Sequence, residues 1–544
     1  MPRFIFFALF CLFLASCARI VMPSGGPKDT TPPKVVAEKP ESGTTNFQEK
    51  SIKITFDEYV TLNNPVENTI FSPPLNERVE YTTKGKSVVV KIKDTLRENT
   101  TYNILFSDCI QDFNEGNKLS SYNYAFSTGD SIDMHKLFGV VISAETNQPE
   151  VGVFVMLYEN DIDSLPLTTR PNYITKTDAQ GKFIFHHLKS QHYKVFALKD
   201  INSNLKFDLP NERIAFADNV FQAKFYATDS LLKADTAAFI TLRMFQEADT
   251  IQVLSPLINP KTGIYHFPYK IPLHSFDIQI ESDTIIDFFS KINTTRDTIS
   301  LYLKTFFETT AKAYIQTDST RIDTVELFPY KAPQQRRAST PVLNITLSNR
   351  DDLFVPTLLN FSYPVKPADS VPMLVIATIK GEKDTMAIYL NIPDDFVMQV
   401  PIPFVFEPKI NYTVRLQDSL LFGYDGTTND SLISSFSKRT EKDYGNLIVH
   451  YKVDDKNDAD FIVELHTSNQ KVIRKDIISS SKTIEYKHLL PGNYRIKVIE
   501  DRNKNDKWDT GNYRKKLQPE RIFYIDKEIS IRGFWDVEED VSLF

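Results

Sequence analysis

The sequence predicts an all-β protein in which several β-sandwich domains follow one another as a multi-domain rod. Short segments with alternating apolar and polar residues recur along the whole chain, and 40 Phe and 24 Tyr stand against only 17 Gly. Such alternation and such aromatic residues are typical of half-buried strands. Because a single hydrophobic core stops growing well below 544 residues, the chain is expected to hold about three to five domains.

One stretch of sequence occurs twice, which indicates an internal duplication. The first copy runs from His187 to Asn211 and the second from His488 to Asn512, and the two align without a gap. In each copy an alternating run precedes a polar loop that is built from Asp and Asn. Side chains of Asp and Asn hydrogen-bond their own backbone two residues on. Each copy therefore predicts one strand that is followed by one ordered loop.

The first residues have the pattern of a cleavable leader that ends in a lipid attachment site. Arg3 precedes an apolar run over residues 4–14, which is too short to span a bilayer. The segment Leu14–Cys17 (LASC) resembles the lipobox of bacterial lipoproteins. The resemblance implies a signal peptide over residues 1–16, lipidation of Cys17, and attachment to a membrane through that lipid. The alternative is an ordinary secretory signal that contains a cysteine.

Charge and cysteine content exclude several classes of protein. The net charge is −7 with both signs interspersed, whereas nucleic-acid binding needs a concentrated basic surface, so no nucleic-acid partner is expected. Of the three Cys, Cys11 leaves with the leader and Cys17 would carry the lipid. Cys109 is then alone, and no intramolecular disulfide can form. The domains must therefore rely on hydrophobic cores, with Cys109 as a small buried hydrophobe.

Residues 34–129 form the first expected domain. They follow a flexible tether over residues 17–33, which has two proline-containing clusters and no apolar period. Alternating runs separated by clusters of turn residues predict a sandwich of the Ig type. A family resemblance is carried by the motifs Pro32–Val36, Ile54–Val60, Asp112–Asn117 and Phe126–Gly129. They resemble the bacterial Ig-like domain first described in surface-layer proteins of the SbsA type, which implies an Ig-like fold.

Residues 130–247 are expected to form a second kind of sandwich. The segment Thr177–Phe183 (TDAQGKF) places Asp178 and Gly181 where a turn between two strands needs them, and the alternating strand Tyr193–Leu198 follows. This T-D-x-x-G-x-F turn and the strand after it resemble the transthyretin-like module of carboxypeptidase regulatory domains. The resemblance implies a small sandwich that also carries the first duplicated loop.

The remainder of the chain is interpreted as one unassigned module and a second pair of the two domain types. Residues 248–340 contain alternating runs that match no known pattern, and they end in a linker. Residues 341–443 echo the first Ig-like domain, because Leu359–Val365 parallels Ile54–Val60. Residues 444–544 repeat the transthyretin-like unit without its T-D-x-x-G-x-F turn. The expected order is two Ig-like/transthyretin-like pairs with a β module inserted between them.

The duplicated loops are the strongest candidate site. Oxygen-bearing side chains stand at positions 1, 3, 5 and 9 of a calcium-loop numbering, and such alternate hard ligands can converge on one Ca²⁺. These residues are Asp200, Asn202, Asn204 and Asp208 in the first copy, and Asp501, Asn503, Asn505 and Asp509 in the second. Position 6, however, is Leu205 or Asp506 instead of the EF-hand Gly, and position 12 is Asn instead of Glu. Two interpretations stay open, a weak calcium site and a loop whose Asp and Asn side chains satisfy its own backbone.

Two polar clusters receive structural interpretations. His186 and His187 point to opposite faces of a strand and cannot chelate one metal together. His187 has an equivalent in His488, which favours a hydrogen bond at a strand end. The pair Asp57-Glu58 is interpreted as a solvated edge, because the second Ig-like domain has Ser362-Tyr363 at this place.

Nothing in the sequence predicts a reaction centre. The motifs G-x-S-x-G, H-E-x-x-H, C-x-x-C and the Walker loop are absent from it, so no catalytic residue, no enzyme and no cofactor beyond the open calcium question is predicted. The aromatic residues Tyr265, Phe267 and Tyr269 either form an exposed ligand platform or alternate into a core.

A wider resemblance points to the cell envelope. The leader, the tether segment Gly25–Asp29 (GGPKD) and the strand Phe56–Val60 (FDEYV) together resemble the Ig-like-domain envelope lipoproteins of the Bacteroidota. The resemblance implies an outer-membrane lipoprotein that acts as a non-enzymatic scaffold, with an envelope protein such as a β-barrel complex as partner. A surface adhesin or carbohydrate-binding protein is the alternative. Residues 18–21 lack the acidic run of a surface-export signal, which favours the periplasmic face and leaves the outer face open.

Overall fold

The structure is a computed structural model. It describes residues 29–120, 122–248, 252–255, 264–303, 309–317, 322–328, 343–366, 368–379, 381–393, 397–424, 426–454, 458–525 and 527–543. The chain divides into two compact units, residues 1–246 and 247–544. The predicted leader, the lipidation site Cys17 and most of the tether lie outside the described residues.

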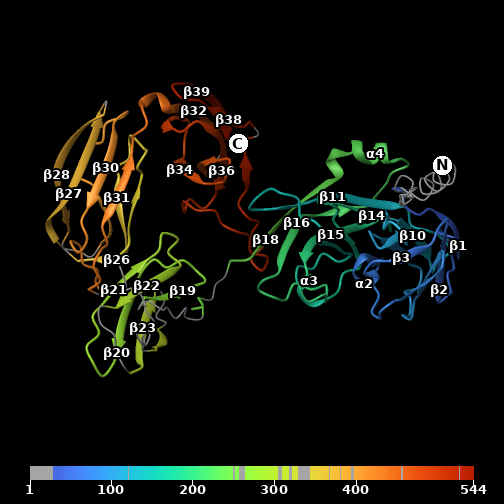
Figure 1. The fold of residues 1–544 in the computed structure, drawn as a ribbon. Coiled ribbons are helices and arrows are strands. Elements are labelled where there is room, and N and C mark those ends of the chain that lie inside the picture. The colour runs from blue at the N-terminus through green and yellow to red at the C-terminus, as the bar shows by residue number, and fades with distance from the viewer. Residues whose placement is uncertain are drawn as a thin grey trace, which may run out of the picture. The chain divides into compact units, whose positions relative to one another are not determined.

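The first unit opens with a sandwich of short strands (Figure 1). Its elements are β1 (Val35–Lys39), β2 (Ser51–Phe56), β3 (Val60–Leu62), α2 (Pro65–Asn68), β4 (Thr69–Ser72), β5 (Glu80–Lys84), β6 (Ser87–Lys91), β7 (Thr101–Phe106), β8 (Ile110–Asp112), β9 (Lys118–Leu119) and β10 (Tyr122–Ser127). They form the sheets β1-β2-β6-β5, β10-β7-β4 and β3-β8-β9. The predicted alternation is confirmed, because Ile52, Ile54 and Phe56 of β2 are buried and share one core with Tyr102 and Phe126.

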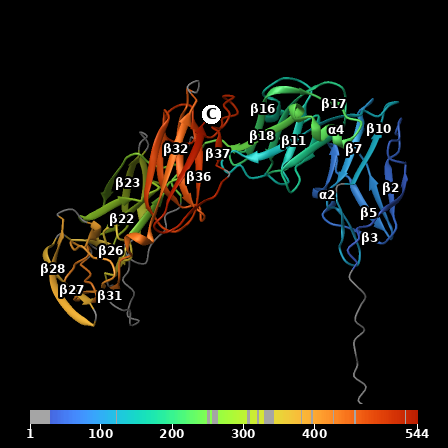
Figure 2. The ribbon, with the colours of Figure 1, turned by 90° about the horizontal axis from the view of Figure 1, so that it is seen from above.

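The second module of this unit follows directly. Its elements are β11 (His135–Ser143), β12 (Phe154–Tyr158), α3 (Leu165–Thr168), β13 (Tyr173–Lys176), β14 (Lys182–Leu188), β15 (His192–Lys199), β16 (Arg213–Gln222), β17 (Lys224–Phe225), α4 (Asp229–Ala234), the 3₁₀ turn η1 (Thr236–Ala238) and β18 (Phe239–Gln246). The strand order is β13-β12-β15-β16-β18-β11-β14, and β17 pairs with β11. The core contains Val155 and Tyr193 from one part of this sheet and Phe183, Phe185 and Leu242 from the other. Figure 2 shows α4 beside the β11 end of the module.

The turn that carries the T-D-x-x-G-x-F motif has the expected local geometry. One carboxylate oxygen of Asp178 accepts hydrogen bonds from the backbone N–H groups of Gln180 (2.9 Å) and Lys182 (2.8 Å). Gly181 has a φ of +70°, and a Cβ there would lie 2.6 Å from the carbonyl oxygen of Val141. Both the left-handed backbone and the close approach therefore require glycine.

The second unit begins with two small sheets around their own core. The strands are β19 (Ile264–Pro268), β20 (Phe276–Glu281), β21 (Phe288–Ile292), β22 (Thr298–Leu303), β23 (Ala311–Thr317) and β24 (Ile322–Leu327), in the orders β19-β22-β21 and β20-β23-β24. Tyr265, Phe267 and Tyr269 are at most 4% exposed and belong to this core. The interpretation of these rings as buried alternation is thus confirmed, and the exposed platform is wrong.

The next sandwich of the second unit is larger. Its elements are β25 (Ile345–Ser348), β26 (Leu358–Val365), β27 (Ala368–Ile379), β28 (Glu382–Ile392), β29 (Val397–Pro401), β30 (Asn411–Leu416), β31 (Leu432–Phe436) and the 3₁₀ turn η2 (Glu441–Asp443). The sheets are β25-β26-β29 and β28-β27-β30-β31. Phe361, Val375 and Val414 from both sheets share one core.

The last module contains the second duplicated segment. Its strands are β32 (Gly445–Val453), β33 (Asp460–Thr467), β34 (Val472–Ile478), β35 (Lys482–Leu489), β36 (Gly492–Asp501), β37 (Ile522–Tyr524), β38 (Ile529–Ile531) and β39 (Asp536–Leu543). They form the sheets β35-β32-β39 and β34-β33-β36-β37, with β38 paired to β36. Leu447, Val463 and Val498 lie in the core between them.

The two duplicated segments occupy equivalent places in their modules. β11 pairs antiparallel with β14 and parallel with β18, and β32 pairs in the same two ways with β35 and β39. The polar loops follow β15 and β36, and each of these strands is paired on both sides. The second copy keeps this arrangement even though it lacks the T-D-x-x-G-x-F turn.

The prediction of an all-β, multi-domain protein is confirmed. The described α-helices have only four to six residues. Within the described part of the chain, no helix has the length and the apolar character that crossing a membrane requires.

We expect Gly139→Ala to destabilise the first unit, because a Cβ at this position of β11 would lie 2.0 Å from the carbonyl oxygen of Ile240 on β18. Overpacking of this kind costs about 1–3 kcal/mol of unfolding free energy. Calorimetry should therefore show a lower unfolding midpoint. Gly492→Ala is the control and should leave the midpoint unchanged, since nothing lies within 4 Å of a Cβ there. An unchanged midpoint for Gly139→Ala would contradict the close approach of β11 and β18.

Candidate functional site

The first Asp/Asn loop closes on itself. The carboxylate of Asp200 accepts hydrogen bonds from the backbone N–H groups of Ser203 (2.7 Å) and Leu205 (2.8 Å). The side-chain amides of Asn202 and Asn204 donate to the two carboxylate oxygens of Asp208, at 3.1 and 2.7 Å. All four residues predicted for this loop are thus brought together.

The second loop repeats this geometry. Asp501 accepts from the backbone N–H groups of Asn505 (3.2 Å) and Asp506 (2.8 Å). The side-chain amides of Asn503 and Asn505 both donate to one oxygen of Asp509, at 2.5 Å. Position 6 of the loop, where an EF-hand has Gly, adopts a positive φ in both copies, +58° at Leu205 and +63° at Asp506. The backbone conformation is therefore shared although the residue type differs.

Each loop is also held by a buried glutamate that the sequence analysis missed. Glu212 is fully buried and accepts hydrogen bonds from the backbone N–H groups of Asp208 and Leu209, both at 3.0 Å. Glu520 accepts from the backbone N–H groups of Arg502 and Asp509, both at 2.9 Å. Burial is the main cause that raises the pKa of Glu520 above its ordinary value.

The sequence spacing explains why these two glutamates were not predicted. Glu212 lies one residue past the end of the gapless alignment, and Glu520 lies eight residues past it. Only the position of both side chains under the loop makes them equivalent. A search for a buried acid at variable distance after each loop could have found them.

The closed loops favour the interpretation that Asp and Asn satisfy one another. The amide nitrogens of the Asn residues, not their oxygens, face Asp208 and Asp509. Among the described residues, no group of three His, Cys, Asp or Glu side chains is arranged to hold a metal ion. Calcium binding remains a prediction, which requires the amides to rotate so that their oxygens face the ion.

We expect a thermal melt of the protein in excess EDTA to have the same midpoint as a melt in millimolar calcium, because the loops already satisfy their own polar groups. A midpoint that rises with calcium and falls with EDTA would contradict the self-satisfied loop. The variant Asp208→Asn with Asp509→Asn is the control. It removes the carboxylate at position 9 of each loop and should therefore abolish any rise of the midpoint with calcium.

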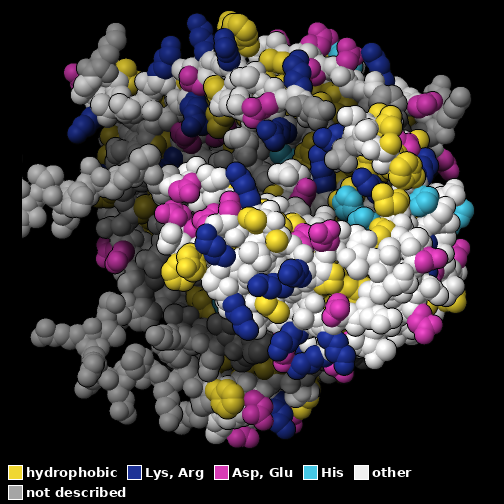
Figure 3. Space-filling model, turned by 90° about the vertical axis from the view of Figure 1, so that its right-hand side faces the viewer, with side chains coloured by type: hydrophobic (Ala, Val, Ile, Leu, Met, Phe, Trp, Pro, Cys, Tyr) yellow, Lys and Arg dark blue, Asp and Glu magenta, His cyan; other side chains and the backbone are white. Residues whose placement is uncertain are grey.

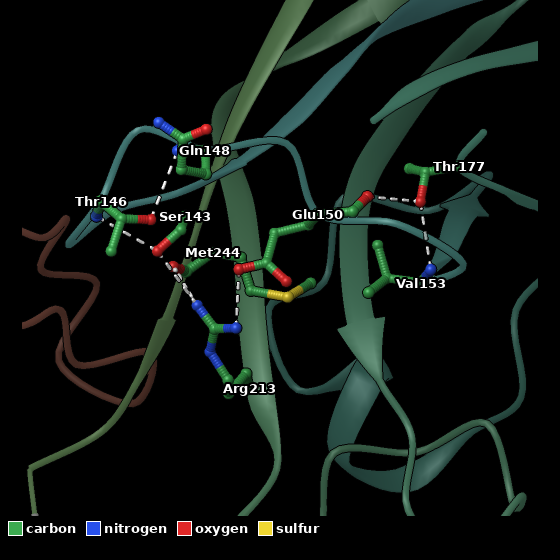
Figure 4. A network of polar contacts seen from close by, with 8 residues as sticks. All are labelled: Ser143, Thr146, Gln148, Glu150, Val153, Thr177, Arg213 and Met244. Atoms are coloured by element: carbon green, nitrogen blue, oxygen red, sulfur yellow. Dashed lines mark hydrogen bonds and ion pairs between the residues drawn. The ribbon is translucent and has the colours of Figure 1, made fainter. Parts of the chain in front are cut away.

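Arg213, next to Glu212 in sequence, anchors a second loop of the same module (Figure 4). Its guanidinium lies 2.6 Å from the Glu150 carboxylate and donates to the carbonyl oxygen of Met244 at 3.3 Å. The backbone carbonyl of Glu150 in turn accepts a hydrogen bond from the hydroxyl of Thr177 (2.6 Å). At the entry to β16, Glu212 thus holds the first Asp/Asn loop, and the next residue, Arg213, holds the segment around Glu150.

The histidine prediction holds in part. A ring nitrogen of His187, Nδ1, lies 3.0 Å from the carbonyl oxygen of Asp133, which fits the expected hydrogen bond at a strand end. Burial is the main cause that lowers the pKa of His187. The ring of His488 instead stacks on Phe354, with ring centroids 3.4 Å apart. His187 and His488 share a left-handed backbone, with φ of +59° and +57°.

The remaining candidates have structural roles. Cys109 is fully buried and burial raises the pKa of its thiol, so this side chain belongs to the core as predicted. Asp57 is exposed and accepts a hydrogen bond from the backbone N–H of Lys34 at 2.8 Å. The pair Asp57-Glu58 is thus consistent with its interpretation as an edge.

Comparison with known proteins identifies part of the chain. Residues 29–128 match the family described as bacterial Ig-like domain, which confirms the Ig-like resemblance of the first domain. No curated protein matches the sequence. The family match covers less than a quarter of the chain and leaves the other modules without a family.

Solved structures with some similarity include a bacterial S-layer protein and a bacterial pilin subunit. The TIE protein of Bacillus anthracis shares 10% identity, covers 96% of this chain and 76% of its own, and has a TM-score of 0.15. The N-terminal part of the bacterial S-layer protein SbsC shares 16% identity over 40% of this chain and 44% of its own, with a TM-score of 0.13. The major pilin subunit BcpA of Bacillus cereus shares 12% over 75% and 99%, with a TM-score of 0.14.

Proposed function

We propose that this chain is a non-enzymatic lipoprotein of the cell envelope, held at the outer membrane through Cys17, which binds another envelope protein along a sheet edge. Tandem sandwiches, the bacterial Ig-like domain at residues 29–128 and the lipobox-like Leu14–Cys17 support this proposal. Transthyretin-like modules over residues 130–247 and 444–544 are part of it.

The observation that carries the proposal is the edge strand β28. It ends the sheet β28-β27-β30-β31 and pairs with β27 without interruption from Leu390 to Glu382. No described strand pairs with its other side. From Thr385 to Ile392 it has no charged residue, no Gly and no Pro. Met386 and Tyr389 within this stretch are 39% and 59% exposed.

Other long edges of the second unit carry charges in the middle of the strand, whereas β28 carries them only at its start, at Glu382, Lys383 and Asp384. Natural sheets avoid unwanted pairing by placing charges, Pro or bulges on their edges. The edge strand β34 has Arg474, Lys475 and Asp476 in its middle, and its pairing with β33 is irregular. The edge strands β35 and β39 also carry several charged residues.

The chemistry of β28 defines the partner. A strand that adds to this edge pairs its backbone with β28, and its side chains extend both faces of the sheet, beside Met386 on one face and Tyr389 on the other. A charged residue opposite Thr385–Ile392 would lose water without gaining a partner. The expected partner segment is therefore an extended, uncharged run in another envelope protein. No described residue specifically favours the alternative of a carbohydrate-binding adhesin.

We expect Met386→Lys with Tyr389→Lys to abolish partner binding, because charges on an edge strand oppose strand addition. The measurement is affinity capture from detergent-solubilised envelopes, with mass spectrometry of co-eluting proteins. Val472→Lys with Ile473→Lys on β34 is the matched control, since these side chains are 45% and 42% exposed, and it should retain the partner. Equal retention or equal loss in both variants would contradict the edge proposal, and an empty wild-type capture would favour the adhesin.

We expect Cys17→Ser to release the protein from the membrane, because this thiol is the proposed attachment point of the lipid. Metabolic labelling with an alkyne fatty acid, followed by fractionation of the cells, measures both properties. Cys109→Ser should keep the label. A labelled Cys17→Ser variant, or a wild type without label, would refute the anchor.

A further inference from the structure

The first unit contains a cavity that none of the roles above uses. Its volume is about 610 Å³, within the range of small-molecule sites, which are mostly apolar with a few polar groups. Leu105 of β7 and Leu232 of α4 both line it. The floor comes from the outer face of the strands β14, β11 and β18.

The floor is an apolar row across three strands. Phe138 of β11 stands opposite Ile184 of β14 in the antiparallel register and opposite Phe239 of β18 in the parallel register. The rings of Phe138 and Phe239 pack edge to face with centroids 5.9 Å apart. Phe239, at the β18 end of this row, is 39% exposed, whereas Phe138 in its middle is 6% exposed. Together the three side chains form a continuous surface that is only partly covered.

The second copy of the module shows that the fold does not require this row to be apolar. Ile448 of β32 has the same two neighbours by register, and these are Glu485 on β35 and Glu538 on β39. Both glutamates are exposed. The same rung of the same strand arrangement is therefore charged and solvated in one copy and apolar in the other.

Only the first copy has a cover over this face. The helix α4 precedes β18, whereas no helix is described between β38 and β39. Leu232 of α4 is buried, and the ring of Tyr226 packs edge to face on Phe138 at 5.8 Å. Figure 3 shows hydrophobic side chains that gather beside histidines at the upper right of the visible face. The cover shields part of the row and leaves the cavity beneath it.

Some of the charged side chains that line the cavity already have partners within the protein, and others do not. Asp178 accepts two backbone hydrogen bonds, and Asp235 accepts from Lys224 and Tyr226, both at 2.9 Å. Lys182 and Lys233 are exposed and pair with no described carboxylate. The acids are therefore engaged by the protein itself, as is Lys176, which donates to the carbonyl oxygen of Glu67 at 2.9 Å, whereas Lys182 and Lys233 remain available.

We propose that this cavity binds a small amphiphilic anion. Its apolar body lies on the row of Ile184, Phe138 and Phe239 beneath α4, and its anionic group, a carboxylate or a similar group, lies at Lys182 and Lys233. Burial of the apolar body drives binding, and the two lysines set the orientation. This site is separate from the edge β28, so each proposal can fail without the other.

The test uses the full chain with Cys17→Ser, so that no acyl anchor competes, and the fluorescent probe 11-(dansylamino)undecanoic acid. We expect saturable binding of one probe per chain. Ile184→Glu with Phe239→Glu, which installs the side chains of the second copy, should weaken binding about tenfold or more. Glu485→Gln with Glu538→Gln is the matched control in the second copy and should leave the affinity unchanged.

A second pair of variants guards against a folding defect. Lys182→Glu with Lys233→Glu changes only exposed side chains, and it should weaken binding of the acid several-fold while leaving binding of its methyl ester unchanged. Equal affinity of the wild type and the Ile184/Phe239 variant, or no saturable binding at all, would overturn the site. An equal response of acid and ester to the lysine variant would overturn the position of the anionic group.

Discussion

The parallel pairing between the first and last strands of each repeated module is the constraint on which the rest of these modules depends. β11 lies beside β18, and β32 lies beside β39. This pairing brings residues from the two ends of a module into one row, and at Gly139 it leaves no room for a Cβ. The opposite part of the module, which carries the Asp/Asn loop, is held against this pair by the shared core.

Much of the fold could be predicted from the sequence, because burial on one face of a strand imposes a period of two. Ile52, Ile54 and Phe56 are examples, and the duplicated loops were found from spacing alone. The roles of Glu212 and Glu520 could not be predicted, because their distances from the loops differ. The row of Ile184, Phe138 and Phe239 was also out of reach, because it depends on the register of strands that are distant in sequence.

Duplication has preserved the backbone and changed the surface. The two Asp/Asn loops keep their hydrogen bonds and their left-handed residues. The outer face of the module has an apolar row in the first copy and a pair of glutamates in the second, and the helix α4 accompanies only the apolar version. The interior that sets the strand arrangement is thus shared by the two copies, whereas their outer faces differ.

The buried Cys109 gives the first domain a chemical property of its own. It is the only cysteine among the described residues, and its side chain is closed off from solvent. A thiol in such a core reacts with an alkylating reagent only when the surrounding sandwich opens. The rate at which Cys109 is alkylated in living cells therefore measures how often this domain opens, and the measurement needs no engineered label.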